Sequence, residues 1–240
     1  MFAGPNGSGK SELKQYLRPS LLGVYLNPDE LEGAIRKQGF LDFSTYGVTA
    51  TGAEVLAFFT RSSFLMSAGF SEGAKRLSFA ESRLVFAGVE VNSYFASVAA
   101  DFLRQRLLER KISFTFETVM SHPDKLALLA QVQRAGYRTY LYYIATDDPA
   151  INIFRIRYRV KLGGHAVPED KVESRYHRSL DLLMDAIRLT NRAYIFDNSG
   201  DNRAPTWIAE ITDGRELELK IREIPAWFKR AVLGKFTPAT

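Results

Sequence analysis

The sequence contains no cysteine, and this absence excludes several classes of protein. Disulfide-stabilised secreted domains, cysteine-ligated zinc sites and iron–sulfur clusters all need cysteine side chains. Histidine is scarce as well, because the chain has only His122, His165 and His177, and their spacing is not that of metal ligands. We expect His165 to form hydrogen bonds within a loop rather than to act in catalysis.

Long apolar runs are also missing. No stretch approaches the roughly 18 consecutive apolar residues that a membrane span needs, because Ser, Gly, Arg and Glu interrupt every apolar segment. The first residues lack the basic region and the apolar run of a signal peptide. We therefore expect a cytoplasmic protein with no membrane segment.

The composition that remains is that of a folded globular protein. Of 240 residues, 46% are hydrophobic and 25% are charged, which are ordinary values for a protein with a packed core. The chain has 32 Lys and Arg residues against 27 Asp and Glu residues, a net charge of +5. This excess is compatible with anionic ligands, but it is too small to indicate nucleic acid by itself.

Predicted strands and helices alternate along the chain. Short apolar or alternating segments predict strands at about 23–27, 111–117, 138–145 and 193–197, with helical segments between them. This alternation predicts an α/β fold, in which helices cover both faces of a parallel sheet.

Two regions depart from the alternation. Residues from about 41 to 92 contain no clear strand, and their apolar residues recur at helical spacing, which predicts a helical insertion. Residues from about 205 to 235 contain two strand-like runs around Asp213-Gly214, a hairpin signal, followed by a short helix. Because no linker divides the chain, we predict a single domain over residues 1–240.

The residues before the first predicted helix match the phosphate-binding loop pattern of a Gly, four free positions and Gly-Lys-Ser/Thr. The matching residues are Gly4, Pro5, Asn6, Gly7, Ser8, Gly9, Lys10 and Ser11. In this pattern the backbone N–H groups and the helix start bind phosphate, the lysine reaches the β- and γ-phosphates, and the hydroxyl is a ligand of Mg²⁺. The alternative is a glycine-rich turn that caps a helix and leaves Lys10 in solvent.

The strand that should carry this loop is nearly absent. Such a loop normally follows a central strand of about five residues, and only Met1, Phe2 and Ala3 precede Gly4. We therefore expect either a strand reduced to a stub or a truncated start.

Two carboxylates follow predicted strands, where ligands of α/β sheets bind. Asp29 follows the strand at 23–27 and is the candidate catalytic base, although an Asp here can also be a helix N-cap. Glu117 closes the strand at 111–117, and Thr118 follows it. A carboxylate in this place needs a partner, so we predict that Glu117 orients substrate or the metal ion. We predict that Thr118 contacts substrate.

Basic residues recur on two later helices. Arg155 and Arg159 lie four residues apart on one predicted helix, while Ile153, Ile156 and Val160 are expected to face the core. The next helix carries Lys171, Arg175 and Arg178 at similar spacing. The turn at 163–168 between the helices is a candidate lid. Guanidinium groups stabilise the charge of a transferred phosphoryl group, although most helix arginines are simply solvated.

Several motifs together resemble the zeta-toxin-like kinases, and more narrowly their bacterial branch described as predicted ATPases. The motifs are GPNGSGKS at 4–11, LNPDEL at 26–31, FETVMS at 116–121, RVKLGGHAVPEDKVESRYHRSL at 159–180 and IFDNSG at 195–200. The resemblance covers most of the chain apart from about 41–92 and the last forty residues. The arginine-to-leucine motif is its most specific part.

The resemblance implies a P-loop kinase fold and phosphorylation of a sugar hydroxyl of UDP-N-acetylglucosamine by ATP or GTP with Mg²⁺, with an antitoxin protein as partner in some systems. By position, Lys10 and Ser11 are loop residues, Asp29 is the base and Glu117 orients substrate or metal. Arg159, together with Arg155 or Arg175, holds phosphates. The Gly-Gly-His and Val-Pro form of the long motif departs from the characterised toxins, which leaves the acceptor open.

Two other hypotheses remain. A nucleotide-dependent switch or a nucleic-acid-associated NTPase would hydrolyse nucleotide without an acceptor, and its nucleic-acid binding would weaken steeply with salt. A truncated, inactive relative would act as a binding module. No recognition helix supports the first of these, so we favour the kinase.

Overall fold

The computed structural model describes residues 1–164, 166–201 and 203–236. Seven strands hydrogen-bond in the order β10-β9-β8-β7-β1-β6-β2, and a second sheet has the order β3-β5-β4. The mostly parallel sheet flanked by helices confirms the predicted α/β fold class. Within these described ranges, no helix has the length and apolar composition that a membrane crossing would require.

The chain forms two compact units. The first unit consists of Met1–Arg18 and Glu117–Thr240, and the second consists of Pro19–Phe116. The predicted phosphate loop, Glu117 and the candidate arginines all belong to the first unit, whereas Asp29 belongs to the second.

The sheet of the first unit centres on β1 and β7. Its strands are β1 (Phe2–Ala3), the end of β6 (Phe114–Thr118), β7 (Tyr140–Ala145), β8 (Arg192–Asp197), β9 (Thr206–Thr212) and β10 (Glu216–Leu219). β1 pairs in parallel with β6 and β7, and β7 pairs in parallel with β8. The antiparallel hairpin β9–β10 extends the edge and turns at Asp213-Gly214, both with positive φ, as the sequence predicts.

The strand that leads into the glycine-rich loop, β1, consists here of Phe2 and Ala3 and is a central strand of the sheet. Phe2 and Ala3 are fully buried, and Phe2 lies opposite Glu117 on one side and Tyr142 on the other. The Met1 amino group donates to the Tyr140 carbonyl over 2.7 Å, and its burial lowers the pKa of this group to about 5. Pairing on both sides therefore anchors the loop despite the short strand.

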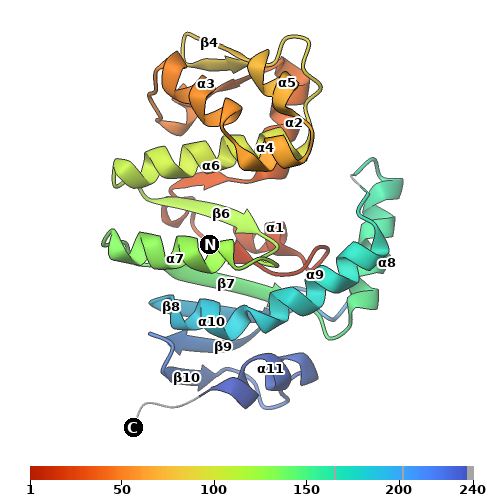
Figure 1. Cartoon of the computed structure of the whole chain (residues 1–240). Coiled ribbons are helices and arrows are strands. Elements are labelled where there is room, and N and C mark those ends of the chain that lie inside the picture. Colours follow the sequence, from red (N-terminus) through yellow and green to blue (C-terminus); the bar gives the residue numbers. More distant parts are fainter. Residues whose placement is uncertain (165, 202, 237–240) are drawn as a thin grey trace. The chain divides into compact units, whose positions relative to one another are not determined.

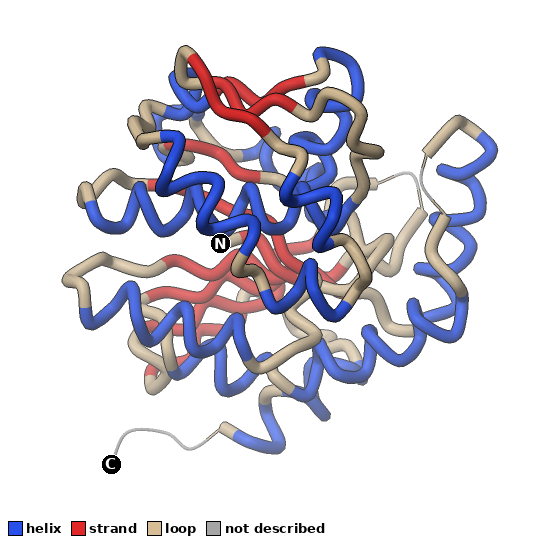
Figure 2. Tube along the Cα trace, turned by 45° about the horizontal axis from the view of Figure 1, so that its top comes forward, coloured by secondary structure: helices blue, strands red, loops and turns tan. Residues whose placement is uncertain are grey.

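Helices flank this sheet (Figure 1). They are α1 (Lys10–Leu13), α7 (Asp124–Arg134), α8 (Pro149–Lys161), α9 (Glu169–Asp181), α10 (Leu183–Arg188) and α11 (Ala226–Ala231), with 3-10 turns at Lys14–Tyr16 and Leu233–Lys235. The helix predicted from 168 to 191 is broken at Leu182 into α9 and α10. α10 packs against α7 and α9, and α8 packs along α9 (Figure 2).

The second unit combines helices with short strands. Its elements are 3-10 turns at Pro19–Leu21 and Phe43–Tyr46, the helices α2 (Pro28–Gln38), α3 (Gly52–Thr60), α4 (Ser63–Ser67), α5 (Ser71–Lys75) and α6 (Ser93–Glu109), and the strands β2 (Val24–Leu26), β3 (Phe40–Asp42), β4 (Ser78–Ala80) and β5 (Arg83–Val85). β2 pairs in parallel with the start of β6.

The region at about 41–92, predicted as a helical insertion with no clear strand, contains three short strands beside its helices. Its helices α3, α4 and α5 accompany the antiparallel sheet β3-β5-β4. β4 and β5 are joined by Glu81 and Ser82, both in the left-handed region with φ of 49° and 60°. Hairpin turns of this kind are usually recognised in a sequence by Gly, Asn or Asp at these positions. Because the turn residues here are Glu and Ser and each strand has only three residues, the sequence did not indicate a hairpin.

Candidate active site

The glycine-rich loop begins directly after β1 and leads into α1. The N–H of Ser8 donates to the Pro5 carbonyl over 3.3 Å, and the N–H of Glu12 donates to the Gly9 carbonyl over 3.1 Å. Gly7 and Gly9 have φ of 75° and 96°. A chain that curls through such left-handed residues turns successive N–H groups toward one concave side, which is a site for anions.

The side chain of Lys10 lies along the loop. Its ammonium Nζ donates to the carbonyls of Gly4 and Pro5, both over 2.9 Å. The ammonium group of Lys10 therefore has two acceptors within the loop, and its role toward a phosphate stays a prediction. A phosphate group bound by this loop would replace one or both carbonyls as the hydrogen-bond acceptor of the Lys10 ammonium group.

Ser11 and Glu117 meet beside the loop. The Ser11 hydroxyl donates to Oε2 of Glu117 over 3.1 Å, and Glu117 is buried with 8% exposure. The pairing of β1 with β6 places Glu117 opposite Phe2, two residues before the loop begins. The buried carboxylate thus has the partner that its position requires.

The chemistry of these two groups fits Mg²⁺. This ion prefers oxygen ligands and keeps several waters, so one or two protein oxygens beside substrate phosphates suffice. Among the described residues there is no group of three or more acidic or histidine side chains that would form a metal cage. Ser11 and Glu117 supply two such oxygens beside the loop.

Thr118 shapes the turn that follows β6. Its hydroxyl accepts a hydrogen bond from the Met120 N–H over 3.0 Å, and Met120 is buried with φ of 53°. The Ser179 hydroxyl on α9 donates to the carbonyl of Val119 over 2.8 Å. The segment after Glu117 is held in place from both sides, and its role toward a substrate stays a prediction.

Asp29 lies at the start of α2 in the second unit. Asn27, not Asp29, is the N-cap, because the Asn27 side chain accepts a hydrogen bond from the Asp29 N–H over 2.9 Å. The carboxylate of Asp29 is in the first turn and exposed. The helix-cap alternative for Asp29 is therefore wrong, and its role as a base stays a prediction.

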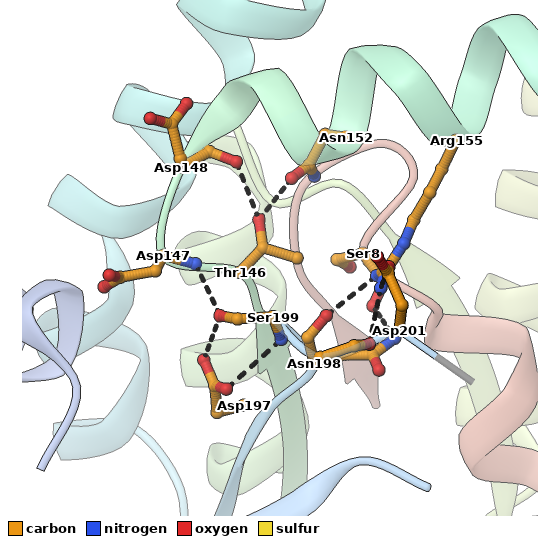
Figure 3. Close-up of polar contacts among 11 residues, drawn as sticks. Ser8, Thr146, Asp147, Asp148, Asn152, Arg155, Asp197, Asn198, Ser199 and Asp201 are labelled. Carbon is orange, nitrogen blue, oxygen red and sulfur yellow. Dashed lines mark hydrogen bonds and ion pairs between the residues drawn. The ribbon is translucent and has the colours of Figure 1, made fainter. Parts of the chain in front are cut away.

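The candidate arginines have different surroundings. Arg155 on α8 donates to the carbonyls of Asn198 and Gly200 over 2.8 and 3.0 Å (Figure 3). Arg159, one turn further along α8, is exposed, and Arg175 on α9 is half-buried. Arg155 therefore binds the segment that follows β8, whereas the side chain of Arg159 is exposed to solvent.

An apolar groove of about 390 Å³ lies between α8 and α9. Ile153, Ile156, Val160 and Val172 are among its lining residues. Val160 is 37% exposed, so the expectation that it faces the core was wrong. The predicted lid turn joins these helices, and its residue His165 lies outside the described residues.

Two buried asparagines that the sequence reasoning missed contact the glycine-rich loop. Asn152 of α8 donates to the Asn6 carbonyl over 2.6 Å, and Asn198 after β8 donates to the Ser8 carbonyl over 2.8 Å. Asn198 lies in the IFDNSG motif, which could have drawn attention to it. Asn152 has no comparable signal, because a neutral amide on an amphipathic helix carries neither charge nor a distinctive spacing.

Comparison with known proteins supports the resemblance read from the motifs. The zeta toxin family model matches residues 87–204, a range that includes Glu117, the arginines and both asparagines but not the glycine-rich loop. An uncharacterised protein of Haemophilus influenzae (strain ATCC 51907 / DSM 11121 / KW20 / Rd) is 33% identical over 69 residues, which is 29% of this chain and 49% of that protein. The chain therefore matches about half the length of this curated relative.

The fold is similar to that of solved structures. The crystal structure of AvrRxo1-ORF1:AvrRxo1-ORF2 with sulphate ions has a TM-score of 0.52 at 16% identity, covering 91% of this chain and 60% of that chain. The crystal structure of AvrRxo1-ORF1:-ORF2 with ATP has a TM-score of 0.50 at 16% identity, covering 99% of this chain and 63% of that chain. The chain thus spans less than two thirds of these neighbours, and the likeness shows that the chains share a fold.

Proposed function

We propose that this chain, which matches the zeta toxin family over residues 87–204, is a phosphotransferase that moves the γ-phosphoryl group of ATP or GTP to a hydroxyl of a small acceptor. The observation that carries the proposal is the hydrogen bond between Ser11 and Glu117 beside a loop lined by Lys10. It joins the hydroxyl of the phosphate-loop pattern to a buried acid, which is an arrangement suited to Mg²⁺ and nucleotide.

In the proposed complex, each loop group has one task. Backbone N–H groups of residues 4–9 bind the phosphate oxygens, and Lys10 neutralises the β- and γ-phosphates. Ser11 and Glu117 would hold Mg²⁺ directly or through water, and the ion would supply positive charge that offsets the charge of the phosphates.

The transfer itself needs a base and further positive charge. The acceptor hydroxyl oxygen bonds to the γ-phosphorus while the bond to the bridging oxygen breaks, and the hydroxyl proton passes to a carboxylate, for which we propose Asp29. Arg159, with Arg175 or Arg155, stabilises the charge on the transferred group. Thr118 orients the acceptor, and Glu117 does so in the alternative in which it does not hold the ion.

The proposed acceptor follows from the motif resemblance, and the proposed partner follows from the structural neighbours. UDP-N-acetylglucosamine is the first acceptor to test, because the resemblance to zeta toxins implies a sugar nucleotide. The AvrRxo1 neighbours were crystallised as two-chain complexes, and on that ground we include an antitoxin-like protein partner in the proposal.

The test is a screen of acceptors for the mass of one added phosphate group, with ATP or GTP and Mg²⁺. The Lys10→Ala variant is compared with wild type, and Lys229→Ala, a change of an exposed lysine on α11, is the matched control. The proposal requires transfer by wild type and by the control, and loss of transfer in Lys10→Ala. Equal transfer by Lys10→Ala would remove the loop from the mechanism, and hydrolysis without any acceptor would favour the NTPase hypothesis.

A further inference from the structure

We propose that Asn152 and Asn198 are positioning residues that set the shape of the phosphate loop from its outer side. The inference rests on the proposed function of this loop in binding polyphosphate. Neither buried amide takes part in the transfer described above, and Asn198 is the asparagine of the IFDNSG motif.

Asn152 is fixed by contacts on both sides of its amide. It is fully buried, its Nδ2 donates to the carbonyl of Asn6 over 2.6 Å, and its Oδ1 accepts from the hydroxyl of Thr146 (Figure 3). Because a carbonyl only accepts, the amide nitrogen must face Asn6. The side chain therefore has one orientation, and in it Asn152 is a donor to the loop.

Asn198 is held by its own backbone. Its N–H donates to the Ala145 carbonyl over 2.8 Å, and its carbonyl accepts from Arg155 over 2.8 Å. Its side-chain Nδ2 then donates to the carbonyl of Ser8 over 2.8 Å. Figure 3 shows this chain of contacts, with Arg155 reaching from α8 toward the segment that carries Asn198.

Both contacts act on the direction of loop N–H groups. In a planar trans peptide the carbonyl and the following N–H point to opposite sides. Drawing the Asn6 carbonyl toward Asn152 therefore turns the Gly7 N–H away from Asn152. Drawing the Ser8 carbonyl toward Asn198 turns the Gly9 N–H away from Asn198 in the same manner. Each asparagine thus orients one N–H toward the opposite side of the loop.

The glycines beside these contacts leave no room for another side chain. A Cβ atom on Gly7 would lie 2.7 Å from the Asn152 carbonyl oxygen, and one on Gly9 would lie 2.4 Å from Nδ2 of Asn198. Both glycines also have the positive φ that side chains disfavour. The two asparagines and the two glycines therefore form one packed arrangement that fixes the backbone.

The test measures binding of inorganic tripolyphosphate with Mg²⁺ by calorimetry, which needs no acceptor and no turnover. Asn152→Leu and Asn198→Leu remove the donor without adding charge. Asn191→Leu is the matched control, because the Asn191 side chain is bonded to Thr139 and Asp213 and not to the loop. We expect affinity about tenfold weaker in each of the first two variants and unchanged affinity in the control.

All measurements are made at a temperature at which far-UV circular dichroism shows each variant to be folded. Where a leucine variant does not fold, Asn152→Ala and Asn198→Ala, which remove the donor without adding charge or bulk, are compared with Asn191→Ala. Wild-type affinity in the Asn152 and Asn198 variants would overturn the inference. Binding by wild type without transfer to any acceptor would refute the proposed function and leave this inference standing, whereas absence of binding by wild type would overturn both.

Discussion

The hydroxyl of Ser11 donates a hydrogen bond to Oε2 of Glu117 over 3.1 Å, joining two residues that are 106 positions apart in the chain. If this pair holds Mg²⁺, Glu117→Gln should raise the Mg²⁺ concentration needed for half-maximal transfer by about 10- to 100-fold, the usual effect of altering a group that orients a metal site. A Mg²⁺ titration of turnover at saturating nucleotide measures this.

The matched control is Glu173→Gln, because Glu173 is exposed on α9. Its Mg²⁺ dependence should equal that of wild type. An unchanged Mg²⁺ dependence in Glu117→Gln with a raised KM for the acceptor would assign Glu117 to the acceptor instead of the ion.

Arg155 and Arg159 offer a second comparison, since they lie one turn apart on α8. Arg155 donates to the carbonyls of Asn198 and Gly200, so Arg155→Ala should lower the free energy of unfolding by about 2 kcal/mol. Arg159 is exposed, and Arg159→Ala should change the free energy of unfolding by less than about 0.5 kcal/mol. Urea denaturation followed by circular dichroism gives both values.

The two arginines should also differ in activity. The proposed function predicts that Arg159→Ala reduces turnover without a change in stability. If Arg155→Ala left stability intact and reduced turnover alone, Arg155 would be a phosphate ligand and not an anchor of the segment after β8.

These residues show what could be predicted from the sequence. The glycine-rich loop and strand β6 were predictable because glycine spacing and period-two alternation are local signals. The meeting of Ser11 with Glu117 follows only from the order of strands, which places β6 beside β1. The Asn152 and Asn198 contacts could not be predicted, because they depend on the positions of three distant segments.

Trp227 and Trp207 provide a matched pair for stability. Trp227 is fully buried and its Nε1 donates to Oδ1 of Asp197 over 2.8 Å, whereas Trp207 is 39% exposed and donates to the Ala209 carbonyl. Trp227→Phe should cost about 2–3 kcal/mol, since it removes a donor from a carboxylate and leaves space in the core.

Trp207→Phe should cost less than about 1 kcal/mol, because solvent can replace its lost hydrogen bond. Circular dichroism in urea is the readout, since tryptophan fluorescence changes with the substitutions themselves. Equal losses in the two variants would mean that the contact between Trp227 and Asp197 contributes nothing measurable.

Substitution of Ser8 should have the opposite effect on stability. Its hydroxyl is fully buried, and among the described residues it has no hydrogen-bond partner. Ser8→Ala removes the buried hydroxyl and keeps the Ser8 carbonyl that Asn198 contacts, so stability should stay unchanged or rise by about 1 kcal/mol. Nucleotide affinity should equal that of wild type. A loss of affinity with intact stability would make the Ser8 hydroxyl a ligand of the nucleotide.

In a polypeptide that starts at Met1, the buried amino group should make the free energy of unfolding depend on pH. Burial lowers its pKa from 8.0 to about 5, so between these values the unfolded chain holds a proton that the folded chain lacks. The free energy of unfolding should therefore rise with pH from about 5 to 8, by at most about 4 kcal/mol. The hydrogen bond to Tyr140 reduces this gain, since it favours the charged form.

Nα-acetylation removes the titrating group, so the difference between the acetylated and free forms in urea titrations isolates its contribution. Parallel pH profiles of the two forms would show that the amino group titrates normally in the folded protein.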